Sequence, residues 1–522
     1  MGEAAACSID AEGAPPELLD VLIVGAGISG IDAAYHLQKS CPGKSWAIIE
    51  ARDAIGGTWD LFRYPGIRSD SDMYTLGFPF RPWTGEKAIA DGAAIKAYVE
   101  ETARHFGIDG RIRFRHRATR ASWSSSEARW TVAVETDEGP RTFSCAFLFL
   151  GSGYYDYEAG YRPIWPGEAL YRGRIVHPQH WPEDLDVAGK TIVVIGSGAT
   201  AVTLVPALAE TAAHVTMLQR SPSYIVSRPS RDGLAHRLQR RLPLGLAGNL
   251  VRWKNVLLGM FFFSRARKRP DRVKAAILKL ATEALPPGYD VARHFSPAYN
   301  PWDQRVCLVP DGDLFEAIGA GTVSVATDRI DRFTQTGIAL ASGAELEADV
   351  VVTATGLAVR LLGGIALTVD GEPVDVAGRF SYKGMMLNDV PNLALSFGYT
   401  NASWTLKCDL TSRYVCRLIN HMDRRGDDIC VPRLGAAGME RRPMLDFSSG
   451  YVARAAASLP GQGARAPWRV HQNYLKDLAA MRLRPLTDAA MEFRKARPEQ
   501  GARGARRRPV DSEDGARQLT LT

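Results

Sequence analysis

Two glycine-rich segments have the residue types and spacing that bind phosphate. In the first, Gly25, Gly27 and Gly30 follow an apolar run and open a helix-like stretch, in the pattern G-x-G-x-x-G. The first glycine permits a tight turn, the second lets a pyrophosphate approach the backbone, and the third lets the helix pack closely on the strand. Glu50 follows at the end of the next apolar run, where a carboxylate binds ribose hydroxyls and repels a 2′-phosphate. This segment predicts a site for FAD or NAD rather than NADP, and its place near the N-terminus favours FAD.

The second segment repeats the pattern with a different residue at the ribose position. Gly196 and Gly198 are followed by Thr200 and then by Ala201 in the third glycine position, which the motif allows. Arg220 stands where the first segment has an acidic residue, and a guanidinium suits a 2′-phosphate because it makes charge-assisted contacts. The segment therefore predicts an NADPH site. The alternative is that Arg220 is an ordinary solvated arginine.

Both motifs lie in strand–helix–strand units. The expected elements are strands at Val21–Val24 and Ala47–Ile49 around a helix at Ile31–Lys39, and strands at Thr191–Ile195 and Val215–Leu218 around a helix at Ala201–Ala209. Two such units predict an α/β protein with two Rossmann-like dinucleotide-binding domains and a helical insertion. The predicted organisation is an FAD domain at 18–150 and 381–485, an NADPH domain at 151–225 and 301–380, a basic helical insertion at 226–300, and a disordered tail at 486–522.

Composition excludes several other classes. The seven cysteines show no CxxC or CxxxxC pair, which disfavours a disulfide reductase, and no His/Cys cluster has metal-ligand spacing, so no metal is expected. The N-terminal residues lack the basic and apolar regions of a signal peptide. The longest apolar run, Val256–Phe263, is far shorter than a membrane span. These features predict a cytoplasmic protein with free thiols, at most attached to a membrane surface.

The predicted insertion carries much of the positive charge. Between Arg228 and Lys274 there are thirteen Lys or Arg residues and two Asp, in a chain whose net charge is +7. Leucine, tryptophan and phenylalanine residues are interleaved with these charges. Such a segment can lie on an anionic membrane, although a solvated helical face over a substrate tunnel is the favoured interpretation. Because no recognition motif accompanies the charge, nucleic acid is not an expected partner.

Several further motifs resemble one enzyme family. Gly56-Gly-Thr-Trp59 and Arg63-Tyr-Pro-Gly-Ile-Arg-Ser-Asp70 are similar to the FAD-binding segment of class B flavoprotein monooxygenases. Tyr171-x-Gly173-x-x-x-His177-x-x-x-Trp181-Pro182 resembles the Baeyer–Villiger monooxygenase fingerprint, with Tyr171 in place of Phe. From about Asp20 to about Leu478 the chain most resembles the branch of the type I Baeyer–Villiger family that contains the mycobacterial ethionamide-activating monooxygenase.

The resemblance implies a reaction and assigns residues to it. In this family NADPH reduces FAD, the reduced flavin captures O2 as a C4a-peroxyflavin, and a ketone becomes an ester or lactone. Arg305 matches the arginine that stabilises developing negative charge, and Asp70 matches a carboxylate near that arginine and the flavin. Gln304 replaces a lysine that the family often has there, which places more of the 2′-phosphate binding on Arg220. The expected cofactor-binding residues of the first domain also include Gly57, Thr58, Trp59 and Tyr74.

The remaining expectations concern a linker and the substrate. His177 precedes the NADPH motif and is expected to link the domains rather than to catalyse, and Trp404 and Lys407 are expected near the active site. The expected substrates are O2 and a small apolar ketone or sulfur compound. Two alternatives stay open: an N- or S-oxygenating flavin monooxygenase of the same fold, and a non-catalytic flavin redox sensor, which the second nucleotide motif argues against.

Overall fold

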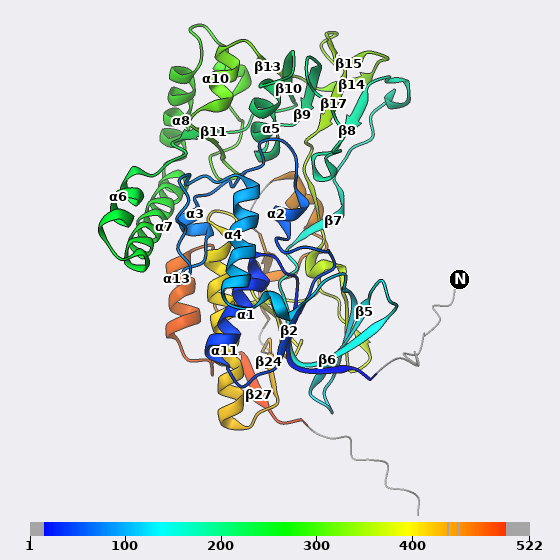
Figure 1. Cartoon of the computed structure of the whole chain (residues 1–522), viewed down its shortest axis with the longest axis vertical. Coiled ribbons are helices and arrows are strands. Elements are labelled where there is room, and N and C mark those ends of the chain that lie inside the picture. The colour runs from blue at the N-terminus through cyan, green and yellow to red at the C-terminus, as the bar shows by residue number, and fades with distance from the viewer. Residues whose placement is uncertain (1–14, 436–437, 446–448, 497–522) are drawn as a thin grey trace, which may run out of the picture.

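The computed structural model describes residues 15–435, 438–445 and 449–496. Within these residues the chain forms two sheet-containing units, with a helical insertion at the side (Figure 1). No helix in the described residues is long and apolar enough to cross a membrane. The six cysteines that the structure describes are buried free thiols.

The first unit is built on a large mixed sheet. In the described residues this sheet has nine strands in the order β20-β19-β4-β5-β6-β1-β2-β3, and β23 also pairs with β6. The pairs β1–β2, β1–β6 and β6–β23 are parallel, as in a Rossmann fold. The strands are β1 (Glu17–Val24), β2 (Trp46–Ile49), β3 (Ile112–Arg113), β4 (Arg117–Ser124), β5 (Arg129–Glu135), β6 (Arg141–Leu150), β19 (Ala366–Val369), β20 (Glu372–Pro373) and β23 (Leu393–Leu395).

Long helices cover the parallel part of this sheet. The end of β1 is a continuous apolar run, Val21–Val24, because it is covered on both faces. Helix α1 packs against α11, and residues of both belong to one apolar core. The helices of this unit are α1 (Ile28–Ser40), α2 (Thr58–Leu61), α3 (Met73–Leu76), α4 (Gly92–His105), α11 (Trp404–Arg425), α12 (Gly450–Ala455) and α13 (Tyr474–Leu478).

The second unit has a smaller, fully parallel sheet. In the part of the chain described, its order is β13-β10-β9-β17-β8. The strands are β8 (Arg174–Val176), β9 (Thr191–Ile195), β10 (His214–Gln219), β13 (Val323–Thr327) and β17 (Val350–Thr353), and the helices are α5 (Ala199–Ala209) and α10 (Asp313–Gly319). A three-stranded antiparallel sheet adjoins them, formed by β14 (Ile330–Phe333), β15 (Gly337–Leu340) and β16 (Glu345–Glu347). The predicted α/β class with two Rossmann-like units is confirmed.

The two chain segments between the units run side by side. Strand β7 (Tyr155–Gly160) leads into the second unit, and β18 (Leu357–Val359) returns from it. They pair antiparallel. His177 packs on this pair, since a Cβ added at Gly160 would lie 1.9 Å from its imidazole Cε1. This placement favours the linker interpretation of His177.

The insertion separates two paired strands of the second unit. It lies between β11 (Ile225–Arg228) and β12 (Cys307–Pro310) and contains α6 (Gly233–Arg241), α7 (Leu244–Lys268), α8 (Pro270–Ala284) and α9 (Val291–His294). Helix α7 passes beside α3 of the first unit (Figure 1). These four helices lie within residues 226–300, the range of the predicted insertion.

Two predicted boundaries differ from the structure. Residues 301–380 were expected to complete the second domain, but β19 pairs with β4 and so extends the first sheet. The sequence predicts a disordered tail from residue 486, but β27 (Met491–Arg494) pairs with β24 (Ile429–Pro432). The prediction of disorder is therefore wrong for this strand. Met491 is buried in the first unit's core, which explains the order. The rest of the predicted tail, residues 497–522, lies outside the described residues.

Candidate active site

A single large cavity joins the two units and the insertion. Its volume is about 1290 Å³, above the range of about 300–1,000 Å³ that is usual for a ligand pocket. Its wall extends from Gly25 and Gly27 in the first unit to Ala199 and Thr200 in the second, and α7 and α8 form one side. The carboxyl ends of β1, β2 and β6 all open into it, which is where parallel sheets bind ligands. The cavity therefore has room for more than one nucleotide cofactor.

The first glycine motif forms a close-fitting cradle. Gly25 has φ +103°, and a Cβ there would lie 2.8 Å from the carbonyl oxygen of Gly151. At Gly30 a Cβ would lie 1.9 Å from the carbonyl oxygen of Gly25. Gly57, with φ +57°, approaches Gly27 so closely that a Cβ would lie 3.1 Å from its Cα. Gly27 is the N-cap of α1, and since the N–H groups of a helix's first turn have no partner within the helix, they can bind phosphate here.

Glu50 sits beside this cradle with its carboxylate fixed. One oxygen accepts a hydrogen bond from the backbone N–H of Ala26 at 2.7 Å, and the other from that of Arg52 at 2.9 Å. Burial raises the pKa of the Glu50 carboxyl, and the two backbone hydrogen bonds oppose that rise. Each carboxylate oxygen can accept more than one hydrogen bond, so ribose hydroxyls can still bind. The cradle and this carboxylate together fit the adenosine diphosphate half of FAD.

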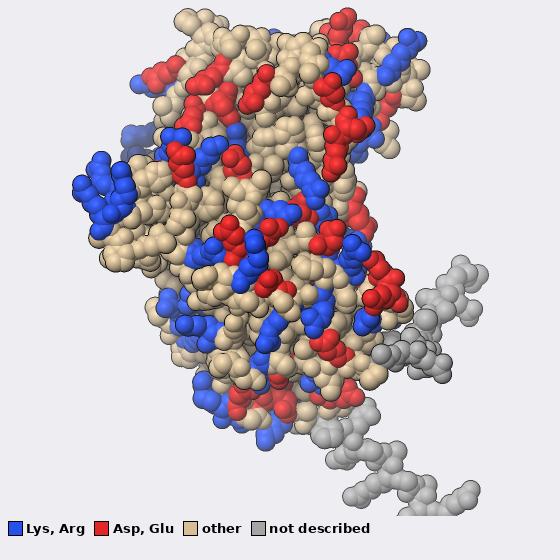
Figure 2. Space-filling view, viewed as in Figure 1, with Lys and Arg blue, Asp and Glu red and all other residues tan. Residues whose placement is uncertain are grey.

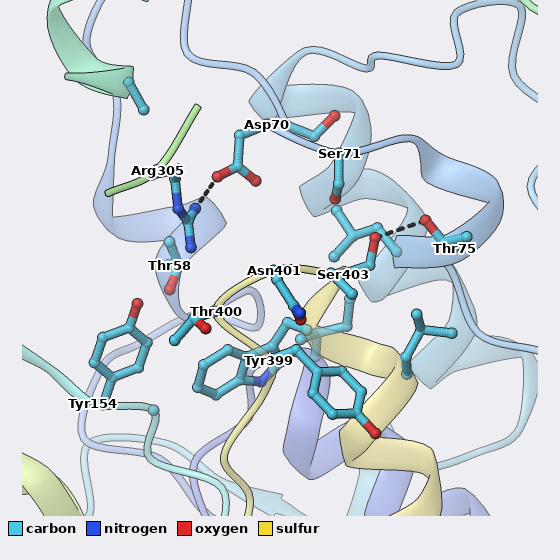
Figure 3. Close-up of a pocket in the computed structure, with 18 of the residues that line it drawn as sticks. Thr58, Asp70, Ser71, Thr75, Tyr154, Arg305, Tyr399, Thr400, Asn401 and Ser403 are labelled. Carbon is cyan, nitrogen blue, oxygen red and sulfur yellow. Dashed lines mark hydrogen bonds and ion pairs between the residues drawn. The ribbon is translucent and has the colours of Figure 1, made fainter. Parts of the chain in front are cut away.

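Arg305 and Asp70 come together from segments far apart in the sequence. Arg305 precedes β12, and its Nη1 donates to a carboxylate oxygen of Asp70 in the first unit (Figure 3). Both side chains line the cavity, and they are about one-third and one-half exposed. The Asp70 carboxylate raises the pKa of Arg305 above its usual value, so the guanidinium keeps its charge. A fixed cation in a mainly apolar cavity can stabilise negative charge that develops on a substrate.

Aromatic residues form the wall opposite this ion pair. Tyr154 stacks on Trp404 with ring centroids 5.2 Å apart, and the Trp404 indole donates to the Ser29 hydroxyl at 2.8 Å. Burial raises the pKa of Tyr154 well above its usual value, so its hydroxyl stays protonated. Trp59 also lines the cavity. These flat surfaces suit an aromatic ring system such as isoalloxazine.

The structure does not bring every expected residue to the cavity. Tyr74 is 4% exposed and packs in the first unit's core, whereas its neighbours Thr75 and Leu76 on the short helix α3 line the cavity. Lys407 is also buried and donates to Asp477 at 2.8 Å. Neither residue lines the cavity.

Part of the predicted NADPH site also lies outside the cavity lining. Thr200 lines the cavity, whereas Gly196, Gly198 and Arg220 do not. Arg220 is exposed at the end of β10. A Cβ at Gly198 would meet nothing within 4 Å, so the motif faces open space at this glycine, whereas a Cβ at Gly196 would lie 2.4 Å from the carbonyl oxygen of Ala354. Such openness suits a cofactor that enters and leaves.

Several cavity residues received no individual role from the sequence. They are Arg68, Tyr154, Tyr399, Thr400, Asn401 and Ser403. Arg68 lies in the family motif that ends at Asp70, and residues 399–403 lie in the one that contains Trp404 and Lys407, so the motifs already indicated these segments. For Tyr154 the signal is its position after β6, since strands of one parallel sheet bring their carboxyl ends to the same edge. All of them except Arg68 are labelled in Figure 3, in the pocket that the Asp70–Arg305 pair also lines.

Comparison with known proteins agrees with this geometry. A family profile described as flavin-binding monooxygenase-like matches residues 86–250, and one described as an NAD(P)-binding Rossmann-like domain matches residues 23–84. The FAD-containing monooxygenase EthA of Mycobacterium tuberculosis is 58% identical over 480 residues, which cover 92% of this chain and 98% of that protein. The probable FAD-binding monooxygenase AlmA of Acinetobacter baylyi is 47% identical, over 91% of this chain and 96% of that protein.

The fold also matches solved structures. An oxidised steroid monooxygenase bound to NADP superimposes with a TM-score of 0.72 at 22% identity, covering 92% of this chain and all of that one. The fold and site thus define a two-nucleotide flavoprotein. The chain belongs to the flavin-binding monooxygenase family.

Proposed function

We propose that this protein is an FAD- and NADPH-dependent monooxygenase of the Baeyer–Villiger type. It would convert a small apolar ketone to an ester or lactone, and it would also oxygenate sulfides or thiocarbonyls. NADPH supplies two electrons, one atom of O2 enters the product and the other leaves as water. The observation that carries the proposal is the Arg305–Asp70 pair, which lies in an apolar cavity continuous with the first glycine cradle.

The residues of the first unit would hold FAD at the glycine cradle and in the adjoining cavity. Gly25, Gly27 and the α1 N-terminus would bind the pyrophosphate, and Glu50 the ribose. Trp59 and Thr58 would flank the ring system. FAD, when bound, supplies the hydride acceptor and the centre at which O2 is activated.

The protein would orient the substrate, exclude water and stabilise charge. Arg305 would hold the ketone oxygen as negative charge develops there, and Asp70 would fix the guanidinium in place. The Tyr154 hydroxyl, protonated at neutral pH, can donate a hydrogen bond in the same region. Apolar side chains such as Val256 and Leu406 keep this end of the cavity dry.

On the second unit, the proposed role of Arg220 is to bind the 2′-phosphate of NADPH. The open surroundings of Gly198 support a cofactor that exchanges between turnovers. Thr200 lines the same cavity as the first glycine cradle, so the two proposed nucleotide sites open into one common space. In this scheme Gly196 and Thr200 contact the pyrophosphate, as the position of the motif at the start of α5 supports.

The test follows NADPH oxidation and O2 uptake by the FAD-loaded protein, with and without 2-octanone or phenylacetone, while products are identified by mass spectrometry. Ester formation in proportion to NADPH consumed is the expected result. NADPH consumption that yields peroxide but no ester would move the function to sulfides and amines, the N- or S-oxygenating alternative. A protein that binds FAD and consumes no NADPH would be a redox sensor.

The cavity mouth supports a proposed contact with an anionic membrane surface. Leu257, Phe261 and Phe262 of α7 are 52%, 56% and 61% exposed, and Arg265 and Lys268 follow on the same helix. Figure 2 shows further Lys and Arg side chains gathered over α6, next to a largely uncharged stretch. Exposed apolar groups beside cations suit an interface with anionic lipid. We expect the protein to sediment with anionic vesicles but not with neutral ones. Binding to neither kind of vesicle, or equal binding to both, would refute this contact.

A further inference from the structure

One buried arginine of the insertion reaches into the first unit beneath the active site. Arg252, on α7, is only 6% exposed. Its Nη1 donates to three backbone carbonyls at the end of α3: those of Tyr74 at 3.1 Å, Thr75 at 3.2 Å and Gly77 at 2.8 Å. These carbonyls come at the end of a helix of four residues, where the helix itself leaves carbonyls unpaired. Arg252 supplies the donors that they need.

A second residue on the same face of α7 holds the other end of α3. Asn255 follows Arg252 by three positions, a spacing that puts both side chains on one side of a helix. The Asn255 amide donates to the Asp72 carboxylate at 2.8 Å. Asp72 caps α3 by accepting from the Thr75 N–H at 3.0 Å. The insertion therefore binds α3 at both of its ends.

The gripped segment is the one that carries Asp70. Only Ser71 separates Asp70 from Asp72. On its far side α3 contacts the start of α11, since the Thr75 and Ser403 hydroxyls are 2.6 Å apart (Figure 3). The position of α3 thus fixes both the carboxylate that orients Arg305 and one wall of the cavity.

We propose that Arg252 and Asn255 form a clamp that positions Asp70 for the reaction. Neither residue is required to touch the reacting atoms; both act through α3. The outer face of α7 carries the exposed apolar residues at the cavity mouth, while this inner face carries the clamp. The clamp therefore connects the outer face of α7, at the cavity mouth, to the Arg305–Asp70 ion pair. This inference rests on the proposed function for the role of Arg305, but not for the geometry of the clamp.

The test is a double-mutant cycle between Arg252→Met and Asp70→Ala in the FAD-loaded full chain. Arg252→Met is expected to lower kcat for ester formation about tenfold, because small misplacement of a catalytic group has large effects. The KM for NADPH should stay unchanged, since the clamp is remote from Arg220, and the yield of ester per NADPH should fall. In the Asp70→Ala background, Arg252→Met should cause no further loss. Additive losses would overturn the proposal, because they would mean that Arg252 acts independently of Asp70.

Lys254→Met is the matched control. Lys254 lies between the clamp residues on α7, but its Nζ pairs with Asp232 inside the insertion. The Lys254→Met variant should leave kcat and the yield of ester per NADPH unchanged. An equal loss in this variant would mean that any disturbance of the insertion lowers activity. Arg252→Lys, which keeps a donor, should recover part of the activity.

A second variant keeps the proposal testable if Arg252→Met does not fold. Asn255→Ala removes the contact to Asp72 and also shortens a side chain that lines the cavity. It should lower the yield of ester per NADPH in the same way, again with no effect in the Asp70→Ala background, which separates loss of the clamp from a change in the cavity wall. The same double-mutant cycle is also measured by the rate of NADPH oxidation, which does not require a ketone. If the wild-type protein forms no ester, the proposed function fails, and the clamp is then tested by the rate of NADPH oxidation alone.

Discussion

The two nucleotide-binding units differ at the second glycine of their motifs, which is covered in the first unit and open in the second. Their first glycines are alike, because a Cβ at Gly196 would lie 2.4 Å from the carbonyl oxygen of Ala354 and one at Gly25 would lie 2.8 Å from that of Gly151. A Cβ at Gly27 would touch Gly57 at 3.5 Å, but one at Gly198 would meet nothing within 4 Å. Glu50 is buried with its hydrogen bonds made, but Arg220 is exposed. The same motif can therefore build an enclosed site for a resident cofactor or an open one for a cofactor that exchanges.

The helices that follow the two motifs differ as well. Asp32 and His36 of α1 are buried and face Asp409 of α11, with His36 Nε2 2.8 Å from the Asp409 carboxylate. The positions of α5 equivalent to Asp32 and His36 hold Thr203 and Ala207. Ionic contacts thus fix α1 to its neighbour, whereas neither of these two positions of α5 holds an ionisable side chain. Four predictions test this contrast, from the largest effect to the smallest.

The third motif position should tolerate a methyl group in the second unit only. Gly30→Ala would place Cβ 1.9 Å from the Gly25 carbonyl oxygen, so the cradle must open. We expect loss of bound FAD, measured as flavin absorbance per protein, and with it loss of all activity. The reciprocal change, Ala201→Gly, should cost only about 1 kcal/mol of stability, as glycine does in a helix. FAD retention by Gly30→Ala would show that the first cradle is not closed.

Arg305 belongs to neither motif and should have the next largest effect. Arg305→Ala should lower kcat for ester formation about 100-fold or more, the effect of removing one group that stabilises developing charge. FAD content should be unchanged, since Arg305 lies beyond the glycine cradle. Arg305→Lys should recover part of the rate. Full ketone oxidation by Arg305→Ala would remove the catalytic assignment.

Arg220 should decide between NADPH and NADH. Arg220→Ala should lower kcat/KM for NADPH about tenfold and leave that for NADH nearly unchanged, because only the contact to the 2′-phosphate is lost. Steady-state kinetics with both cofactors measure this ratio. Arg332→Ala, on the exposed strand β14 of the same unit, is the control. An unchanged preference would mean that Arg220 is a solvated surface residue.

Asp32 should change stability with pH and leave turnover alone. Burial raises its pKa from 3.8 to about 7, an effect that the nearby His36 opposes. Between pH about 4 and about 7 the folded protein holds a proton that the unfolded chain has released, so stability falls as pH rises. Asp32→Asn should flatten this dependence in urea unfolding of the first unit, followed by flavin fluorescence.

The neighbouring Asp409 does not mask this effect. Burial alone would raise its pKa, but hydrogen bonds from His36 and Arg413 lower it below the usual value. Its contribution is therefore lost only as pH falls below about 4, outside the window of Asp32. Thr203→Val, at the matching position of α5, should leave the pH dependence unchanged. A wild-type protein equally stable across that window would contradict the raised pKa.

Local patterns in the sequence predicted the two units well. Apolar runs next to the glycine motifs predicted β1, β2, β9 and β10 and the helices between them. This was possible because turn geometry and the burial of a strand depend on residues that are close in the sequence. The family motifs also led to Asp70 and Arg305, which the structure places in contact. The prediction of a flavin-binding monooxygenase is confirmed by family membership.

Features that depend on long-range contacts were not predicted. Sequence could not place β19 in the first sheet, since its partner β4 lies some 240 residues away in the chain. The direction in which Tyr74 faces was also hidden, because a four-residue helix shows no periodicity. The grip of Arg252 on α3 depends on where the insertion packs, and an arginine among many basic residues gives no signal of burial.

By itself the sequence determined which cofactors and what class of chemistry to expect, because glycine spacing and the residue at the ribose position act locally. The tertiary structure decided which residues meet. It joined Asp70 to Arg305 and Arg252 to α3, since packing of the insertion against the first unit brings together groups that the chain separates by well over a hundred residues.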